Sequence, residues 1–320
     1  RLHDETAPLQ CGCVGQETTG AGGFAKAMRT VPVVLEIAER VRALAPGAWI
    51  VDFTNPVGIV TRALLDEGHR AIGLCNVAIN FQRQIAAHLG VAPERVLVDQ
   101  VGLNHLTWIR SVWLDGRDVL ADVLAGFGDH LAAEIGLPRQ LLDDLGAVPS
   151  YYLRYFYAER EVVEEQRHEP PRAAVVAEIE RALLELYRDE RVDTKPALLE
   201  QRGGAFYSEA ATQLLAALFS SSGETLVVDT RNGGALAGLA ADDVVELPAR
   251  VDTTGAAPLP QRPLAPELLG LVQHVSAYER IAARAARDGD HDLARIALMT
   301  NPLVREYALA GELLGQLRGA

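Results

Sequence analysis

Cysteine is scarce in this chain: Cys11, Cys13 and Cys75 are the only three among its 320 residues. Three cysteines cannot form the paired framework of a small secreted domain, so we expect free thiols in a reducing, cytoplasmic setting. Cys11 and Cys13 are separated by a single residue, which is too short a spacing for the common zinc knuckles. We therefore expect both to be buried as small apolar residues, which leaves Cys75 for separate consideration.

The chain also lacks an excess of positive charge and any long apolar run. Its 43 acidic residues outnumber its 30 basic ones, for a formal net charge of -13. Nucleic acids and anionic membranes bind to basic surfaces, so neither is expected as a partner. No apolar run approaches the roughly 18 residues that span a bilayer, and no signal-peptide pattern opens the chain. With 49% apolar and 23% charged residues, the composition is typical of a globular protein of one large domain or two.

Strand-like and helix-like segments alternate in the first third of the chain. Apolar runs at residues 48–53, 70–75 and 95–101 predict buried strands, and residues 59–67 and 81–89 predict the helices between them. Such alternation favours an open α/β sheet of parallel strands with right-handed crossovers. Ligands bind outside the carboxyl ends of such strands, so we expect the polar side chains found there to converge on one site. These side chains are Asn55, then Cys75 and Asn76, then Asn104 and His105.

Cys75 and His105 are the candidates for metal binding. A thiolate and an imidazole suit a borderline-soft divalent ion, and two protein ligands would leave positions open for substrate oxygens. Two ligands do not by themselves define a metal site, and an isolated cysteine or histidine is more often structural. On the residues alone, both interpretations stay open.

The rest of the chain is expected to mix short strands with many helices. The glycine-rich residues 15–23 either let the backbone approach a ligand or form an ordinary connection, and they do not match the dinucleotide fingerprint. Pro32 is expected to open a helix that ends before Pro46. Strands are predicted at residues 107–114, 227–229 and 243–247, and two long helices at about 264–287 and 291–317.

Seven short motifs follow one another along the chain: Gly15-Gln-Glu-Thr-Thr-Gly20, Thr54-Asn-Pro56, Gly73-Leu-Cys-Asn76, Gly102-Leu-Asn-His105, Tyr152-Leu-Arg-Tyr155, Lys195-Pro-Ala197 and Asn301-Pro-Leu-Val304. In this order they resemble glycoside hydrolase family 4, and within it the 6-phospho-β-glucosidases. The resemblance implies an α/β fold with a Rossmann-type parallel sheet of the lactate/malate dehydrogenase kind in residues 1–105. An α+β catalytic domain would follow in residues 106–320.

The resemblance also implies a redox-assisted hydrolysis of 6-phosphorylated β-glycosides, which the family uses in place of the usual pair of carboxylates. Bound NAD+ would transiently oxidise C3 of the sugar, and a tyrosine would remove the proton from C2. A divalent metal, typically Mn2+, would stabilise the enediolate. The aglycone would then leave from C1 before water adds and the hydride returns.

By the same resemblance, individual residues acquire expected roles. Cys75 and His105 would hold the metal, and Tyr152 would be the base, with Tyr151 as its rival. The expected substrate-binding residues are Arg1, Asn55, Asn76 and Arg172. The α-specific members carry aspartate in place of Asn76, so a carboxamide at this position indicates β-specificity.

Two features depart from the family pattern. Ala78 stands where proline is usual, and the first strand and glycine-rich phosphate loop expected ahead of Arg1 are absent from this sequence. We therefore expect that most of the NAD site is missing, that this chain turns over little substrate, and that its sheet has an exposed apolar edge. The alternatives are a lactate- or malate-type dehydrogenase and a non-catalytic sugar-phosphate-binding remnant. Family resemblance also indicates a homodimer or homotetramer.

Overall fold

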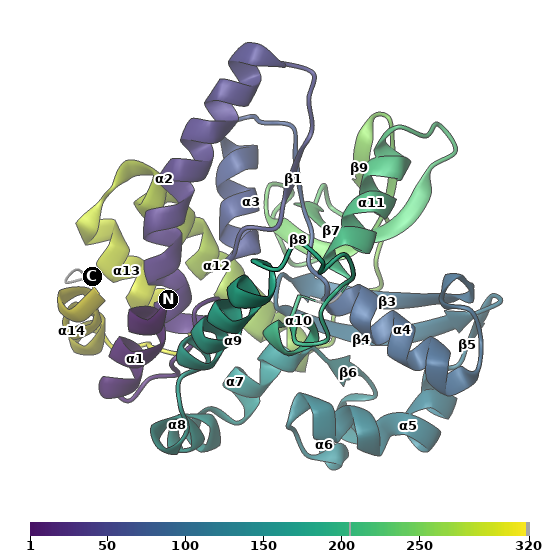
Figure 1. Cartoon of the computed structure of the whole chain (residues 1–320), viewed down its shortest axis with the longest axis horizontal. Helices are drawn as coiled ribbons and strands as arrows, with labels where there is room; N and C mark the ends of the chain where they lie inside the picture. Colours follow the sequence, from purple (N-terminus) through teal and green to yellow (C-terminus); the bar gives the residue numbers. More distant parts are fainter. Residues whose placement is uncertain (205, 318–320) are drawn as a thin grey trace.

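The computed structural model describes residues 1–204 and 206–317, and it is built around one mixed sheet (Figure 1). In the described residues, neighbouring strands follow the order β1-β2-β7-β8-β3-β4-β5, with β6 paired to β4 and β9 paired to β8. The strands are β1 (Ile50–Asp52), β2 (Ala71–Gly73), β3 (Val96–Leu103), β4 (Leu106–Leu114), β5 (Arg117–Asp118), β6 (Val148–Pro149), β7 (Glu224–Arg231), β8 (Val244–Asp252) and β9 (Gly255–Pro258).

Helices pack against the sheet in separate groups. They are α1 (Leu2–Gln10), α2 (Gly20–Leu44), α3 (Val57–Asp66), α4 (Val77–Leu89), α5 (Leu120–Ile135), α6 (Arg139–Leu145), α7 (Arg154–Tyr157), α8 (Glu159–His168), α9 (Arg172–Leu186), α10 (Leu199–Arg202), α11 (Tyr207–Leu218), α12 (Pro266–Asp288), α13 (His291–Thr300) and α14 (Tyr307–Leu317), with short 3-10 helices η1 (Pro93–Arg95) and η2 (Tyr151–Leu153). α2, α3 and α12 pack together, and α13 and α14 extend this group at the left of Figure 1. α4 and α5 pack instead on β3 and β4 at the right.

The predicted strand–helix–strand unit is present at the first two strands. β1 and β2 pair in parallel, with Asp52 opposite Gly73, and α3 connects them. Both strands are buried or half-buried, as their continuous apolar runs predict for a parallel pair covered by helices. The carboxyl ends of β1 and β2 therefore meet at one edge of the sheet.

The prediction that the third strand continues the parallel arrangement is wrong. β3 pairs antiparallel with β4 and β8, and β7 and β8 lie between β3 and β2. The reason is local: β3 ends at Leu103 and β4 begins at Leu106, so only Asn104 and His105 connect them. Such a short connection joins antiparallel strands, because a parallel crossover needs a dozen or more residues. Strands from both expected domains share this sheet, and the boundary at residue 105 stays a prediction.

The start of α2 also differs from the expectation. The helix begins at Gly20, and Pro32 lies inside it instead of opening it. A Cβ at Gly22 would overlap the carbonyl oxygens of Asp4 and Gln16. The glycines therefore allow the first turn of α2 to pack closely on the preceding chain, where any larger residue would collide with the backbone.

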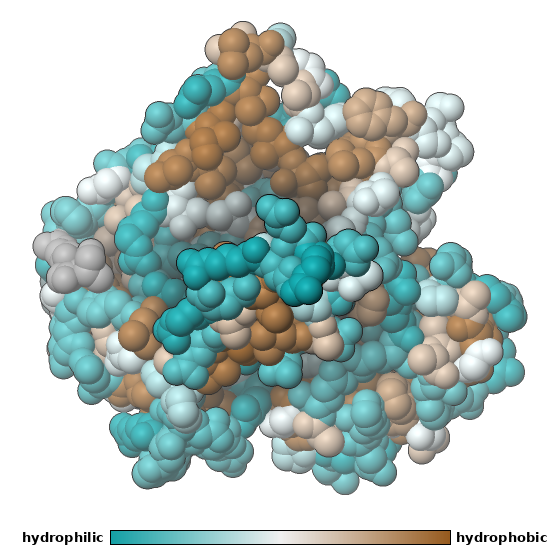
Figure 2. Space-filling model, viewed as in Figure 1, coloured by the Kyte–Doolittle hydropathy of each residue, from teal (hydrophilic) through white to brown (hydrophobic). Residues whose placement is uncertain are grey.

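An apolar surface lies beside the outer edge of β1, which ends the order of described strands. Val33, Ile37 and Leu44 of α2 are all more than half exposed, at 55%, 55% and 83%. Figure 2 shows hydrophobic residues gathered over this part of α2 and the neighbouring surface. These exposed side chains belong to α2, whereas the residues of β1 itself are half-buried or buried. The expected exposed apolar edge of the sheet stays a prediction. None of the helices in the described residues has the length and apolar character needed to cross a membrane.

α12 carries a carboxyl group in the core. Glu279 is only 6% exposed, and its Oε2 has no hydrogen-bond partner among the described residues. Burial raises the pKa of this carboxyl from 4.5 to about 8, while Arg62 opposes the shift and Asp243 adds to it. Glu279 therefore keeps its proton in the folded protein at neutral pH.

Glu279→Gln is expected to reduce the loss of folding stability that the protein undergoes as the pH rises. The unfolded chain loses this proton near pH 4.5 and the folded protein near pH 8, so ionisation favours unfolding between these values. The wild-type protein should lose stability there by at most about 1.4 kcal/mol per pH unit from this group. Urea unfolding at pH 5 and pH 9 measures the effect. Relative to the wild type, the variant should have a higher free energy of unfolding at pH 9 than at pH 5. If the two proteins differed in free energy of unfolding by the same amount at both pH values, the assignment of the raised pKa to Glu279 would be contradicted.

Candidate active site

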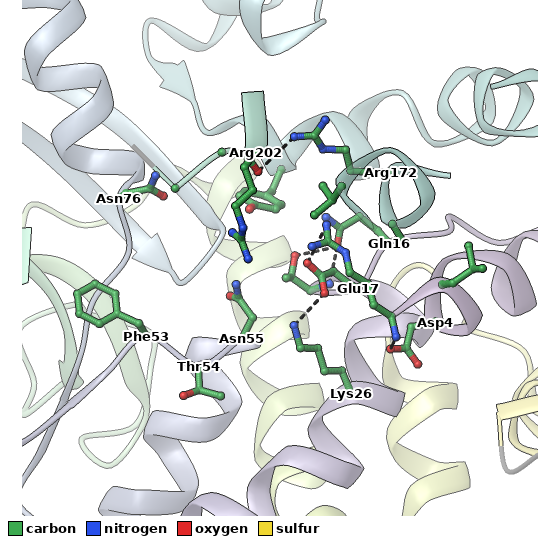
Figure 3. Close-up of a pocket in the computed structure, with 18 of the residues that line it drawn as sticks. Asp4, Gln16, Glu17, Lys26, Phe53, Thr54, Asn55, Asn76, Arg172 and Arg202 are labelled. Atoms are coloured by element: carbon green, nitrogen blue, oxygen red, sulfur yellow. Dashed lines mark hydrogen bonds and ion pairs between the residues drawn. The ribbon is translucent and has the colours of Figure 1, made fainter. Parts of the chain in front are cut away.

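A cavity of about 1350 Å³ opens between the start of α2, the ends of β1 and β2, η2 and α9. Its walls include five residues that the family resemblance assigns to substrate or chemistry: Arg1, Asn55, Asn76, Tyr152 and Arg172. Figure 3 shows several of them around this space, on elements far apart in the sequence. The structure therefore brings these candidates together.

Asn55 and Asn76 reach the cavity from the two parallel strands. Asn55 follows β1, and Asn76 follows β2 as the N-cap residue of α4. The Oδ1 atom of Asn55 is buried without a hydrogen-bond partner among the described residues, and its side chain points into the cavity in Figure 3. An unsatisfied buried acceptor costs free energy until a donor meets it. Asn55 is therefore suited to accept a hydrogen bond from a ligand hydroxyl.

The adjacent tyrosines of η2 have different surroundings. Tyr151 stacks on Phe81 with ring centroids 4.6 Å apart, and its hydroxyl accepts a hydrogen bond from Gln84 Nε2 at 3.3 Å. Tyr152 stacks on the His105 imidazole with centroids 3.8 Å apart. Both line the cavity, but only Tyr152 lies against an expected metal ligand. The geometry therefore favours Tyr152 as the candidate base.

Electrostatics around Tyr152 oppose its ionisation. Burial, and after it the nearby Cys75 thiol, holds the pKa of Tyr152 well above its ordinary value, while a hydrogen bond with Thr18 lowers it. A phenol in this state is a poor base by itself. A positive charge next to Cys75 and His105 would shift the pKa downward, because it stabilises the phenolate.

Hydrogen bonds fix both residues of the turn that carries His105. His105 has a φ of 64°, and its carbonyl oxygen accepts a hydrogen bond from Ser150 Oγ at 3.1 Å. Asn104 Nδ2 donates to Asp229 Oδ2 at 3.3 Å and to Glu246 Oε2 at 2.8 Å. Burial, with a nearby lysine adding to the effect, lowers the pKa of His105 to about 3. Its imidazole is therefore neutral near pH 7, which is the form that binds metals.

Cys75 and His105 fit a metal centre with two protein donors. Both are 5% exposed and both lie beside Tyr152, but neither lines the main cavity. Within residues 1–204 and 206–317, no group of three or more His, Cys, Asp or Glu side chains could hold an ion. A thiol and a neutral imidazole suit a borderline-soft divalent ion, with other positions open to ligand oxygens. Burial raises the pKa of the Cys75 thiol, so metal binding would have to displace its proton.

Arg172 is the cavity cation best suited to a phosphate. Arg1 forms ion pairs with Glu5 at 3.2 Å and with Glu17 at 3.1 Å, which compensate its charge. Arg172 Nη2 donates to the carbonyl oxygen of Gln201 at 2.8 Å, and no carboxylate in the described part of the chain pairs with it. Carbonyl contacts orient the guanidinium and leave its positive charge available to an anion.

Glu17, Lys26 and Tyr207 are among the cavity residues that sequence reasoning missed. Lys26 Nζ pairs with Glu17 at 2.9 Å, from a part of α2 that lies before the helix start expected at Pro32. Glu17 lies inside the motif Gly15-Gln-Glu-Thr-Thr-Gly20, and this position in the motif could have identified it as a site residue. Gly203 and Gly204, which precede Tyr207 in the sequence, also line the cavity and have positive φ angles of 86° and 84°.

Comparisons of the sequence identify its relatives. The profile described as "Family 4 glycosyl hydrolase" matches residues 1–91, and "Family 4 glycosyl hydrolase C-terminal domain" matches residues 100–304. A probable 6-phospho-beta-glucosidase of Bacillus subtilis is 38% identical over 99% of this chain and 75% of its own length. The 6-phospho-beta-glucosidase of Escherichia coli is 34% identical over 94% of this chain and 70% of its own length.

Solved structures show the same relationship. The 6-phospho-beta glucosidase of Thermotoga maritima, solved with NAD and glucose-6-phosphate, has a TM-score of 0.92 at 35% identity, over 99% of this chain and 76% of that chain. A Cryptosporidium parvum malate dehydrogenase has a TM-score of 0.52 at 16% identity, over 83% of this chain and 72% of its own, which shows a shared fold alone. The fold class predicted from the sequence is confirmed. The chain belongs to glycoside hydrolase family 4.

Proposed function

We propose that this protein hydrolyses 6-phospho-β-glucosides with NAD+ and a divalent metal ion such as Mn2+. The observation that carries the proposal is a single cavity in which Tyr152, beside Cys75 and His105, shares the walls with Asn55 and Arg172. Relatives named for this activity support the substrate class, and the Thermotoga maritima enzyme has been solved with manganese, NAD+ and glucose-6-phosphate. A lactate- or malate-type dehydrogenase is not favoured, because it would leave Cys75 and Tyr152 without roles.

Each side chain has a distinct task in this reaction. When bound, NAD+ supplies reversible oxidation at C3 of the sugar, and a metal held by Cys75 and His105 supplies Lewis acidity. Tyr152 removes the proton from C2 and returns one there when water has added at C1. Arg172 binds the 6-phosphate, and Asn55 accepts a hydrogen bond from a sugar hydroxyl.

Asn76 supports the β-specific form of the reaction. It lines the cavity directly after Cys75. A carboxamide donates hydrogen bonds but does not release a proton to a leaving group as a carboxylic acid does. An α-specific enzyme of this family would carry an acid at this position.

Arg172→Ala is expected to raise KM for the phosphorylated substrate by ~10- to 100-fold, because a charge-assisted hydrogen bond to phosphate contributes about 1.5–3 kcal/mol. The change in kcat should be smaller, since the phosphate is remote from the reacting carbons. Steady-state kinetics on p-nitrophenyl β-glucoside 6-phosphate measures both values. Arg188→Ala, beyond the other end of α9 and paired with Glu185, is the control and should leave KM unchanged. Equal KM values for the two variants would contradict the assignment.

The proposed function is tested by omitting one component at a time. The full-length protein, assayed with p-nitrophenyl β-glucoside 6-phosphate under reducing conditions, should release p-nitrophenol only when NAD+ and Mn2+ are both present. EDTA should abolish the activity, and added Mn2+ should restore it. Activity that persists without NAD+ or in EDTA would rule out the mechanism. Net NADH formation from a 2-hydroxy acid would favour the dehydrogenase alternative.

A further inference from the structure

Glu246 is a buried carboxylate that the proposed reaction leaves without a role. It lies in β8, where every residue from Val244 to Ala249 is buried, and it is only 2% exposed. A carboxylate in such a strand is unfavourable unless hydrogen bonds or an opposite charge compensate for the lost water. The groups that compensate Glu246 therefore indicate what it does.

Three N–H groups from the end of β3 and the following turn donate to Glu246. Gln100 Nε2 donates to its Oε1 at 2.6 Å, and Asn104 Nδ2 donates to its Oε2 at 2.8 Å. The backbone N–H of His105 donates to the same carboxylate. Glu246 pairs with Gly102 across the two strands, which brings its side chain to the turn that begins two residues later. Both carboxylate oxygens are thus used to hold this connection.

The backbone of His105 depends on such contacts. Its φ of 64° lies in the left-handed region, which a residue other than glycine keeps only when its surroundings fix it. Ser150 Oγ donates to the His105 carbonyl oxygen at 3.1 Å, and the N–H on the other side of this residue is bound by Glu246. The two contacts together set where the imidazole leaves the chain to stack on Tyr152. Loss of the Glu246 contact would release one side of this backbone unit.

We propose that Glu246 is a positioning residue that holds the His105 imidazole where it can bind the metal ion. The inference rests on the proposed function, which assigns the metal to Cys75 and His105. Glu246 acts through the backbone of His105 and the side chain of Asn104, because its oxygens are already occupied by N–H donors. Outer groups that orient a metal ligand in this way commonly change metal affinity by about 10- to 100-fold.

Glu246→Met is the principal test, because it keeps an unbranched side chain and removes both hydrogen-bond acceptors. The dissociation constant of Mn2+ for the full-length protein, measured by electron paramagnetic resonance titration, should rise by ~10- to 100-fold. In the metal-free protein, the amide hydrogen of His105 should exchange with deuterated water ~10-fold faster, since the turn opens more readily. Wild-type values of both quantities would overturn the proposal.

Glu246→Gln separates the hydrogen bonds of Glu246 from its charge. Gln100 Oε1 is buried without a partner among the described residues, so this amide can turn and accept a hydrogen bond from the new one. The oxygen of the new side chain then remains available to Asn104 and to the N–H of His105. Mn2+ affinity should therefore return to within ~3-fold of the wild type. Affinity as weak as in Glu246→Met would show that charge and not positioning matters, which would contradict the proposal.

Asp243→Asn is the control for a general loss of stability. Asp243 is also buried, and it accepts hydrogen bonds from Arg62 Nη2 and from the N–H of Ala240, both at 2.8 Å, without a bond to the turn. This variant should unfold at lower urea concentration, yet keep the wild-type Mn2+ affinity and the wild-type exchange rate at His105. If it weakened Mn2+ binding as much as Glu246→Met, the assignment of Glu246 would be overturned.

Asn104→Ala provides the test if Glu246→Met does not fold. It removes one of the three hydrogen bonds to the carboxylate and leaves the others in place. Mn2+ binding should weaken by ~10-fold, the lower end of the effect of outer partners, and unchanged binding would count against Glu246. Hydrolysis by the wild-type protein without added metal would instead contradict the proposed function, whereas amide exchange at His105 in the metal-free protein reports on Glu246 alone.

Discussion

Tyr152→Phe is expected to lower kcat by ~1000-fold, within the range of general acid–base contributions. The phenolic oxygen that would accept the C2 proton is lost, while the ring that stacks on His105 remains. Exchange of the C2 proton with solvent, followed by NMR in deuterated water during partial turnover, should slow by a similar factor. Retained exchange at the wild-type rate would show that another group removes this proton.

Tyr151→Phe is the control for Tyr152, because it deletes the neighbouring hydroxyl on the same 3-10 helix. That hydroxyl accepts a hydrogen bond from Gln84, so its loss should cost about 1 kcal/mol of stability and little activity. If Tyr151→Phe stopped C2 exchange and Tyr152→Phe did not, the two roles would have to be exchanged.

Cys75→Ser is expected to weaken Mn2+ binding by ~1000-fold, since a direct ligand should matter more than the outer partners whose loss costs 10- to 100-fold. A serine hydroxyl stays protonated near pH 7 and is a poor substitute for a thiolate. Electron paramagnetic resonance titration with Mn2+ measures the affinity without turnover, and the Mn2+ concentration for half-maximal activity should rise in parallel.

Cys11→Ser provides the comparison for the thiol. Cys11 is half-buried, and its Sγ donates to Glu312 Oε1 at 3.6 Å, away from the cavity. Its substitution should leave the Mn2+ titration unaltered. Unchanged Mn2+ affinity in Cys75→Ser would show that Cys75 is a buried structural thiol, which was the other interpretation of this residue.

The parallel unit could be predicted from the sequence because its signals are local. Apolar runs, the breaks at Pro46 and Pro56, and the polar residues after each run mark β1, α3 and β2 within a few residues. The β3–β4 hairpin could not be recognised in the same way. Its connection, Asn104 and His105, lacks the glycine that commonly marks a two-residue hairpin turn.

The start of α2 at Gly20 could not be predicted from the sequence for a related reason. Glycine is unfavourable inside helices, so Gly20, Gly22 and Gly23 indicate a loop when only local preferences are considered. In the structure, backbone atoms of Asp4 and Gln16 lie where a side chain at Gly22 would be. Tertiary packing therefore outweighs local propensity there, and the same packing brings Lys26 to the cavity.

The sequence by itself determined the chemical groups available to this protein: a thiol, an imidazole, phenols, carboxamides and an arginine, each near a recognisable element. Tertiary structure decided which of them share a cavity. It stacked Tyr152 on His105, committed the Tyr151 hydroxyl to Gln84, and brought Tyr207 into the same space. The physical reason is that distance, burial and ionisation depend on contacts between distant segments, which local residue patterns do not encode.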